Sequence, residues 1–379
     1  MKRKKIIYFV VILLIILMLA FCFFFDWNWV NSYEMYNTSS LSYVSGTVIS
    51  VESENLEKDA DVNRYYGTQE LIVHIKEGSY EGQDLEITNY LSTTSNVLVE
   101  EGMQVIVCVD DPENAEAYVT IYNYDRTIPF AVIIGIFVLG MLLVGGWKGV
   151  KAVLSLVFTL IIIMSFLVQG IYHGLNVIPL VILTLLVVIF LALCILNGVE
   201  KKTLLFATAT MTGLLVAAVF CIMSQKLLKI DGFNFSEVES LLLISRSTEL
   251  QVEHLLFAGV LISSLGAVMD VGVSIVSSLY EVKRANPLQG KKEIFMAGMN
   301  IGKDMIGTMS NTLILAFAGT SLTTMLLLIG FGYQATQLLN SNYLMLEVVR
   351  GISSTFAVVM TVPAASAISA LFIEVDDVV

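Results

Sequence analysis

The chain has 379 residues, of which 56% are hydrophobic and only 14% are charged, and its mean hydropathy is +0.79. In soluble globular proteins about a quarter of the residues are charged, so this composition excludes that class and indicates an integral membrane protein. The net charge of −12 says little about partners, because many acidic residues cluster in one segment while Lys and Arg cluster in short loops. No basic surface is predicted that would bind nucleic acid.

The first apolar run, residues 6–25, is long enough to span a hydrocarbon core of about 30 Å. Four basic residues precede it, at positions 2–5, and they favour a cytoplasmic N-terminus. A cleaved signal peptide is the alternative, but the run is long for one and lacks a small-x-small cleavage site. We therefore predict an N-terminal transmembrane anchor at residues 1–25.

Residues 26–127 have the composition of a soluble domain with short alternating runs at 48–51, 71–75, 85–87, 105–109 and 119–122. Alternation at period two predicts half-buried strands, with Leu71, Val73 and Ile75 facing inward. Glycines at 78, 82 and 102 indicate turns. About five short strands predict a small extracytoplasmic β-barrel resembling an oligonucleotide/oligosaccharide-binding (OB) fold. We expect His74 to be a solvated strand residue.

Residues 128–379 are predicted to form a polytopic transmembrane domain. Apolar segments occur near 128–144, 153–168, 177–196, 204–223 and 255–279, in a stretch that ends near 328, and at 349–372. With the anchor, this gives a membrane α-helical bundle of about eight transmembrane helices. Basic residues at 148, 151, 201, 202, 283, 284, 291 and 292 fall in alternate loops, which predicts that both termini are cytoplasmic. A short amphipathic helix is expected around 238–244.

Polar residues recur on one helical face in two consecutive apolar segments. In the first segment, steps of three or four residues place on one face Ser263, Gly266, Asp270, Ser274, Ser277 and Glu281. In the second, Asn300, Asp304, Thr308 and Asn311 share a face. We expect the two stripes to face each other. Residues 294–305 are predicted either to lie in the membrane interface or to enter the membrane as a re-entrant half-helix, because glycines recur there.

These polar positions have a structural interpretation and a functional one. Small polar residues often serve only to pack helices closely and to bond across an interface, and that use is favoured for the Ser and Gly positions. A carboxylate in a spanning helix costs about 2.5–3.5 kcal/mol on insertion scales, so function is favoured for Asp270. For Asp304, beside Lys303, a solvated or salt-bridged structural role competes equally with a functional one.

Two runs in this region carry a family resemblance: GAVMDVGVSIVSSLYE at residues 266–281 and GMNIGKDMIGTMSNTL at residues 298–313. The pair resembles the signature of the YibE/F-like family of multi-pass membrane proteins, and the resemblance covers most of the chain, including the predicted outer domain. It implies a bacterial-type cell membrane protein but no settled substrate or reaction.

The leading functional hypothesis is a secondary transporter or exporter that uses intramembrane carboxylates for proton or cation coupling. The candidate substrate- or ion-binding residues are Asp270, Ser274, Asn300, Asp304, Thr308 and Asn311. Close-approach or hinge positions are expected at Gly266, Gly272, Gly302, Gly307 and Pro363. The alternative is a non-transporting scaffold or receptor whose outer domain binds a partner. The expected partners are the lipid bilayer, a proton or cation, and a second copy or an extracytoplasmic protein.

No catalytic pattern indicates an enzyme, because phosphate-binding glycine loops, paired-His zinc helices and nucleophile elbows are missing from the sequence. An aspartyl pair of Asp270 and Asp304 is a minor alternative, since their apparent depths differ. The four cysteines, at 22, 108, 194 and 221, lack the spacing of a zinc site or disulfide framework. We expect no metal and no cofactor.

Overall fold

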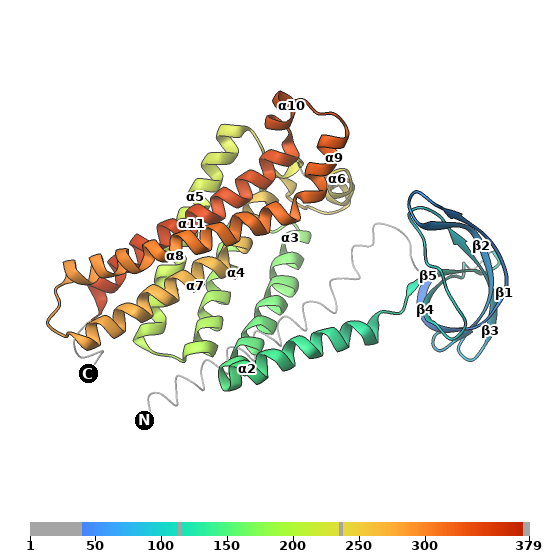
Figure 1. The fold of residues 1–379 in the computed structure, drawn as a ribbon, viewed down its shortest axis with the longest axis horizontal. Coiled ribbons are helices and arrows are strands. Elements are labelled where there is room, and N and C mark those ends of the chain that lie inside the picture. Colours follow the sequence, from blue (N-terminus) through green and yellow to red (C-terminus); the bar gives the residue numbers. More distant parts are fainter. Residues whose placement is uncertain (1–39, 113–114, 235–237, 374–379) are drawn as a thin grey trace. The chain divides into compact units, whose positions relative to one another are not determined.

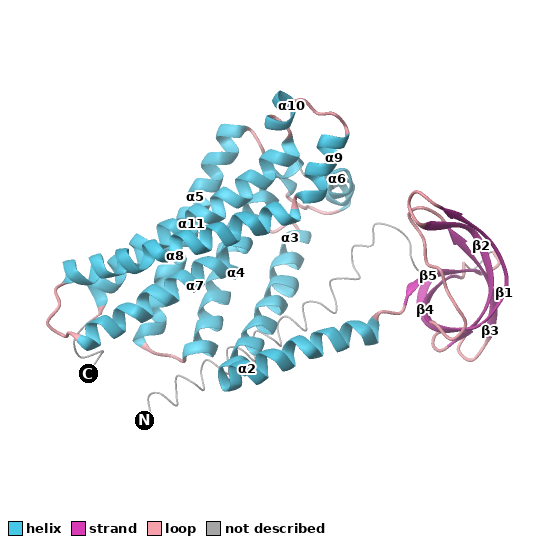
Figure 2. Cartoon of the chain, in the orientation of Figure 1, coloured by secondary structure: helices cyan, strands magenta, loops and turns pink. Residues whose placement is uncertain are grey.

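The computed structural model describes residues 40–112, 115–234 and 238–373. The predicted anchor at residues 1–25 lies outside the described residues. The described residues divide into two compact units, with the boundary between Leu143 and Val144. The first unit therefore includes the start of the helix that begins at Thr127. Below, the β unit means the strand-bearing residues 40–126, and the helical unit means the helices from Thr127 onward (Figures 1 and 2).

Five antiparallel strands form one curled sheet in the β unit. They are β1 (Leu41–Asp59), β2 (Arg64–Ile75), β3 (Asp84–Leu91), β4 (Gln104–Asp110) and β5 (Tyr118–Tyr124). Their order in the sheet is β3-β2-β1-β4-β5, so the long strand β1 lies in the centre and pairs with both β2 and β4. Register shifts in β1 between Val48 and Ser53 help the sheet to curl, because bulges bend a strand.

The side chains of β2 alternate between the inner and the outer face of the sheet, as predicted. Leu71, Val73 and Ile75 are buried inside the curled sheet, whereas Ile72 and His74 lie on its outer face. His74 is solvated, and its Nδ1 lies 2.7 Å from Asp84 Oδ1 across the β2–β3 hairpin. The predicted turn glycines at 78, 82 and 102 all have positive φ angles, which only glycine adopts without cost.

Two buried amides hold an irregular segment inside the β unit. Gln69 and Asn89 are buried, and Asn89 Nδ2 donates to Gln69 Oε1 at 3.0 Å. Gln69 also bonds the backbone N–H and C=O of Val99, while Asn89 bonds the C=O of Val97. Because these amides satisfy backbone groups that no strand satisfies, Val97 and Val99 can fill the sheet interior without a regular element.

The helical unit is built from long apolar helices joined by short turns. The helices are α2 (Thr127–Ile162), α3 (Gln169–Tyr172), α4 (Val177–Asn197), α5 (Lys201–Leu228), α6 (Val238–Ser247), α7 (Leu255–Ala285), α8 (Lys291–Thr320), α9 (Leu322–Gly330), α10 (Ala335–Leu339) and α11 (Asn342–Phe372). α2 is interrupted at Gly146, where φ is 53°, between the two segments predicted at 128–144 and 153–168. Helix α6 confirms the predicted short amphipathic helix.

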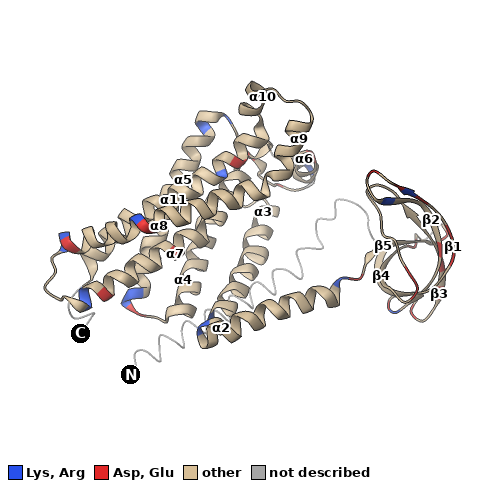
Figure 3. Ribbon diagram, viewed as in Figure 1, with Lys and Arg blue, Asp and Glu red and all other residues tan. Residues whose placement is uncertain are grey.

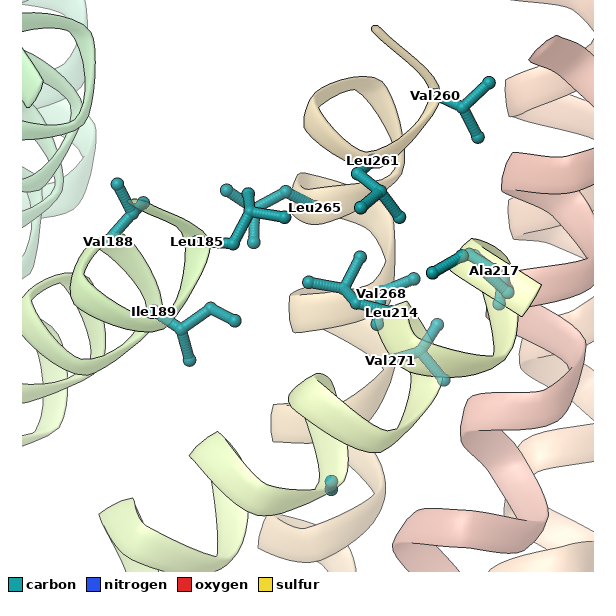
Figure 4. Close-up of a cluster of buried hydrophobic side chains, with 14 of the residues drawn as sticks. Leu185, Val188, Ile189, Leu214, Ala217, Val260, Leu261, Leu265, Val268 and Val271 are labelled. Carbon is teal, nitrogen blue, oxygen red and sulfur yellow. The ribbon is translucent and has the colours of Figure 1, made fainter. Parts of the chain in front are cut away.

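Helix α11 forms the centre of the helical unit, because it packs along α5, α7 and α8 (Figure 1). On the far side of α7 and α5, an apolar core joins both helices to α4. Figure 4 shows part of this core, in which Leu185 of α4 lies beside Leu265 of α7. A single apolar core therefore fixes the orientation of α7 about its own axis.

Five of the described helical runs are long and apolar enough to cross a membrane, and a sixth is added if the bent pair α8–α9 forms one span. The sequence predicted a weakened helix at residues 294–305, but α8 runs continuously through them. The break lies instead at Ser321, where α8 and α9 meet at 51°. The glycines at 298 and 302 do not break the helix because each packs closely against α11.

Candidate functional site

All six predicted binding residues are exposed on the surface of the described chain. Asp270 and Ser274 lie on α7, and four lie on α8: Asn300, Asp304, Thr308 and Asn311. We call the exposed face of α7 from Ser263 to Glu281, together with the exposed face of α8 from Asn300 to Asn311, the polar surface. Both stripes remain open to the outside of the helical unit.

Helix α7 buries the face opposite Asp270. The residues of that face, such as Val268, Val271 and Ile275, are fully buried. Gly272 brings α7 close to α5, because a Cβ atom there would lie 3.1 Å from the Thr210 hydroxyl. Since the apolar residues fix the rotation of α7, Asp270 points away from the core.

Helix α8 is oriented by two glycines. A Cβ atom at Gly298 would lie 2.5 Å from Ser366 Oγ, and one at Gly302 would lie 2.1 Å from Val362 Cγ1, so both positions press α8 against α11. Asp304 follows Gly302 by two residues and therefore lies nearly opposite the α11 contact. The close packing of α8 thus directs its carboxylate outward.

The side chains of the polar surface have few partners. Within the described residues, Asp270, Ser274, Asn300, Asp304 and Asn311 make no side-chain hydrogen bond or ion pair, so Asp304 is not salt-bridged to Lys303. Thr308 is satisfied within its own helix, because its Oγ1 donates to the Met305 carbonyl at 3.1 Å. Charged residues of the helical unit otherwise gather mainly near helix ends (Figure 3).

Of the predicted hinge glycines, two make close contacts and two do not. Gly272 and Gly302 are buried at the α7–α5 and α8–α11 contacts. Apart from its chain neighbours and the nearby backbone of its own helix, no described atom lies within 4 Å of a Cβ placed at Gly266 or Gly307, both on the polar surface. Pro363 lies inside α11, directly after the residue that contacts Gly302, without ending the helix.

A second polar stripe, on α11, is buried; the sequence shows its hydroxyl residues in the last apolar segment, and the structure shows that they are buried. Ser353, Ser354, Thr361, Ser366 and Ser369 are all fully buried. Ser354 bonds Ser264 of α7, with 2.9 Å between the two hydroxyl oxygens. At 100° per residue these five positions spread over about 220° of the helix circumference, and α11 packs against α7, α5 and α8.

The hydroxyls of the α11 stripe are not all satisfied. Within the described residues, the buried hydroxyls of Ser353, Ser369 and Thr210 have no hydrogen-bond partner. A buried unpaired hydroxyl costs free energy, which in a membrane protein is repaid only by close helix approach or by a bound group. The α5–α7–α11 contact is therefore tightly packed but polar.

The outer face of the β unit carries exposed aromatic rings. Tyr43 and Tyr122 are more than half exposed and stack edge-to-face, with ring centroids 4.9 Å apart. The Cys108 thiol beside Tyr43 raises the pKa of that phenol, because a neighbouring ionisable thiol disfavours a phenolate. Exposed tyrosines of this kind are common in protein contact surfaces.

No metal site is found in the part of the chain that the structure describes, since no three His, Cys, Asp or Glu side chains gather there. The polar surface therefore offers single carboxylates and amides rather than a preformed metal cage. Such groups can bind a proton, or a cation that keeps part of its hydration shell.

Comparisons with known families identify both parts of the chain. Residues 133–375 match the family model of the YibE/F-like proteins, and residues 41–124 match that of the YibE/F family N-terminal domain. No curated protein and no solved structure matches the chain. The first match covers α7 and α8 in full, including every residue of the polar surface.

Proposed function

We propose, on the premise that this chain belongs to the YibE/F-like family, that it is a secondary transporter or exporter coupled to a proton or cation. Asp270 binds the coupling ion, and Asp304 and Asn311 help to coordinate ion or substrate. The proposal involves no covalent chemistry. The observation that supports it is the polar surface, where the carboxylates of Asp270 and Asp304 have no partner in the described chain although they lie on long apolar helices.

The physical argument is one of solvation. A carboxylate that meets lipid costs several kcal/mol, about 2.5–3.5 on insertion scales, so the polar surface needs water or protein in front of it. Polar groups with no partner in their own chain are free to exchange ligands, which a coupling site requires. Buried groups such as the Ser264–Ser354 pair are already satisfied and serve packing.

The proposed transport places the chain in the cell membrane with both termini cytoplasmic and the β unit outside. The distribution of Lys and Arg among the loops supports this orientation. The strand order β3-β2-β1-β4-β5, with β3 approaching β5, is the order of an OB-type barrel and supports the finer fold assignment. The β unit would control access to the pathway or recruit a partner.

The alternative function is a membrane scaffold or receptor. The same exposure of Asp270 and Asp304 favours it, because a second copy of the chain could cover the polar surface and hold a homo-oligomer together. The exposed Tyr43 and Tyr122 would then bind an extracytoplasmic protein partner. In this case the carboxylates stabilise assembly rather than bind a transported ion.

The experiment that separates the two functions is ion flux in proteoliposomes. Wild-type protein, Asp270→Asn and the control Glu239→Gln, on exposed helix α6, are reconstituted and subjected to imposed pH and sodium gradients. Transport predicts flux in wild type and control and its loss in Asp270→Asn, because an amide keeps the shape but not the charge. The scaffold predicts no flux in any folded protein, and loss of function when residues 43–124 are deleted.

A further inference from the structure

A cavity of about 490 Å³ lies where α5 ends and α7 begins, away from the polar surface. Its apolar wall includes Ile222, Ile230 and Phe257. Ligand sites for small molecules commonly measure about 300–1,000 Å³ and combine apolar walls with a few polar groups. This cavity has the size and the mixed lining of such a site.

Two local features build the cavity. Lys229 ends α5 in the left-handed conformation, with φ at 54°, a position that usually holds glycine. The short 3₁₀ turn Gly232–Asn234 then packs against the turn Val252–His254, because Gly232 presents no side chain to the Val252 carbonyl. This contact brings the end of α5 beside the start of α7.

The cavity lining carries charges of both signs that do not neutralise one another. Lys226 and Lys229 come from the end of α5, while Asp231 and Glu253 come from the two turns. Within the described residues none of these four makes an ion pair. Lys226, Lys229 and Glu253 are exposed and Asp231 is half-buried, so a ligand can reach these charges from outside without first breaking an ion pair.

The side-chain amide of Gln225 indicates that the ligand carries a hydrogen-bond acceptor. Gln225 lines the cavity, and its Nε2 atom is buried with no partner in the described structure. A buried donor left unsatisfied costs free energy, and a bound acceptor would recover it. His254, at the N-terminus of α7, also lines the cavity and does not cap its own helix.

We propose that this cavity binds a small zwitterionic solute with an apolar part, the chemical class of the free α-amino acids. Asp231 and Glu253 bind the ammonium group, and Lys226 and Lys229 bind the carboxylate, which also accepts from Gln225 Nε2. The apolar part lies against Ile222, Ile230 and Phe257. A solute with one charge would leave either the acids or the lysines unmatched.

The inference names a substrate class for the proposed transporter. Only the claim that this solute is transported rests on the proposed function; the claim that the cavity binds it does not. Binding is measured without flux, so the two can fail separately. A zwitterionic lipid headgroup shares the ligand chemistry, and the experiment distinguishes it by using phosphoethanolamine as a soluble probe in nanodiscs that contain phosphatidylglycerol only.

The test is thermal stabilisation of the full-length protein in these nanodiscs by the twenty amino acids. At least one apolar amino acid is expected to raise the melting temperature in a saturable way. Its carboxylate-only and amine-only analogues should bind about 10- to 100-fold more weakly, because each loses one set of charged hydrogen bonds. The variants Lys226→Gln and Glu253→Gln should weaken binding by similar factors.

Matched controls remove the same charges elsewhere. Lys292→Gln and Glu239→Gln, both exposed and outside the cavity, should bind as wild type does. Stabilisation by no amino acid, equal binding of the single-charge analogues, or unchanged binding in both folded cavity variants would overturn the inference. Stabilisation by phosphoethanolamine alone would also overturn it and would assign the cavity to a lipid headgroup.

Discussion

The two faces of α7 differ in burial: one packs against neighbouring helices and the other is exposed. One face packs Leu261, Val268 and Ile275 against neighbouring helices with almost no exposed area. The other presents Gly266, Asp270 and Ser274 to the outside of the chain. Packing alone determines how the helix is rotated, so the polar face is not needed to stabilise the single chain and its groups remain free for binding.

The largest effect is expected from truncation on the buried face. Leu261→Ala removes a side chain that is 1% exposed and leaves a cavity that neither lipid nor neighbours can fill. The free energy of unfolding should fall by about 2–5 kcal/mol. Ser274→Ala, on the exposed face, should change it by less than about 0.5 kcal/mol. Unfolding in detergent, followed by helical circular dichroism, measures both, and equal effects would refute the assignment of faces.

A smaller effect separates the two kinds of glycine on α8. Gly302→Leu forces a side chain into Val362 and should destabilise the helical unit by about 1–3 kcal/mol. Gly307→Leu enters open space and should be tolerated by the isolated chain. Thermal unfolding of the two variants checks the comparison. A larger loss for Gly307→Leu would mean that the polar surface is covered closely by another protein.

The hydrogen bond between Ser264 of α7 and Ser354 of α11 should contribute less to the free energy of unfolding than either of these packing contacts. A double-mutant cycle of Ser264→Ala and Ser354→Ala is expected to give a coupling free energy of about 0.6 kcal/mol, typical of hydrogen bonds between membrane helices. The control cycle of Ser264→Ala with Ser369→Ala lacks a shared bond and should be additive within about 0.5 kcal/mol. Additivity in both cycles would show that the hydrogen bond between the two serines does not stabilise the contact between α7 and α11.

The smallest effect on stability is expected at Asp270. Asp270→Asn should change the free energy of unfolding by less than about 0.5 kcal/mol, because the carboxylate has no partner in the described chain. Unfolding in detergent micelles provides the measurement. A loss of more than 2 kcal/mol would show that the carboxylate is structural, contrary to the proposed transport.

Local patterns in the sequence predicted the elements of this protein well. Period-two alternation located all five strands and correctly placed Leu71, Val73 and Ile75 inside the sheet. The family resemblance is confirmed over most of the chain. Residues 294–305 were expected either to lie in the membrane interface or to enter it as a half-helix. The helix is continuous there, because the packing of Gly298 and Gly302 on α11 outweighs the low helix preference of glycine.

The sequence by itself determined which residues share a helical face, because helix geometry is local and the step of three or four residues fixes it. It therefore grouped Asp270 with Ser274 and Asn300 with Asp304. Only the tertiary structure decided that these faces point outward, that the hydroxyls of the α11 stripe are buried, and that Lys226 and Glu253 line one cavity. Such placements depend on contacts between distant segments, which no local periodicity encodes.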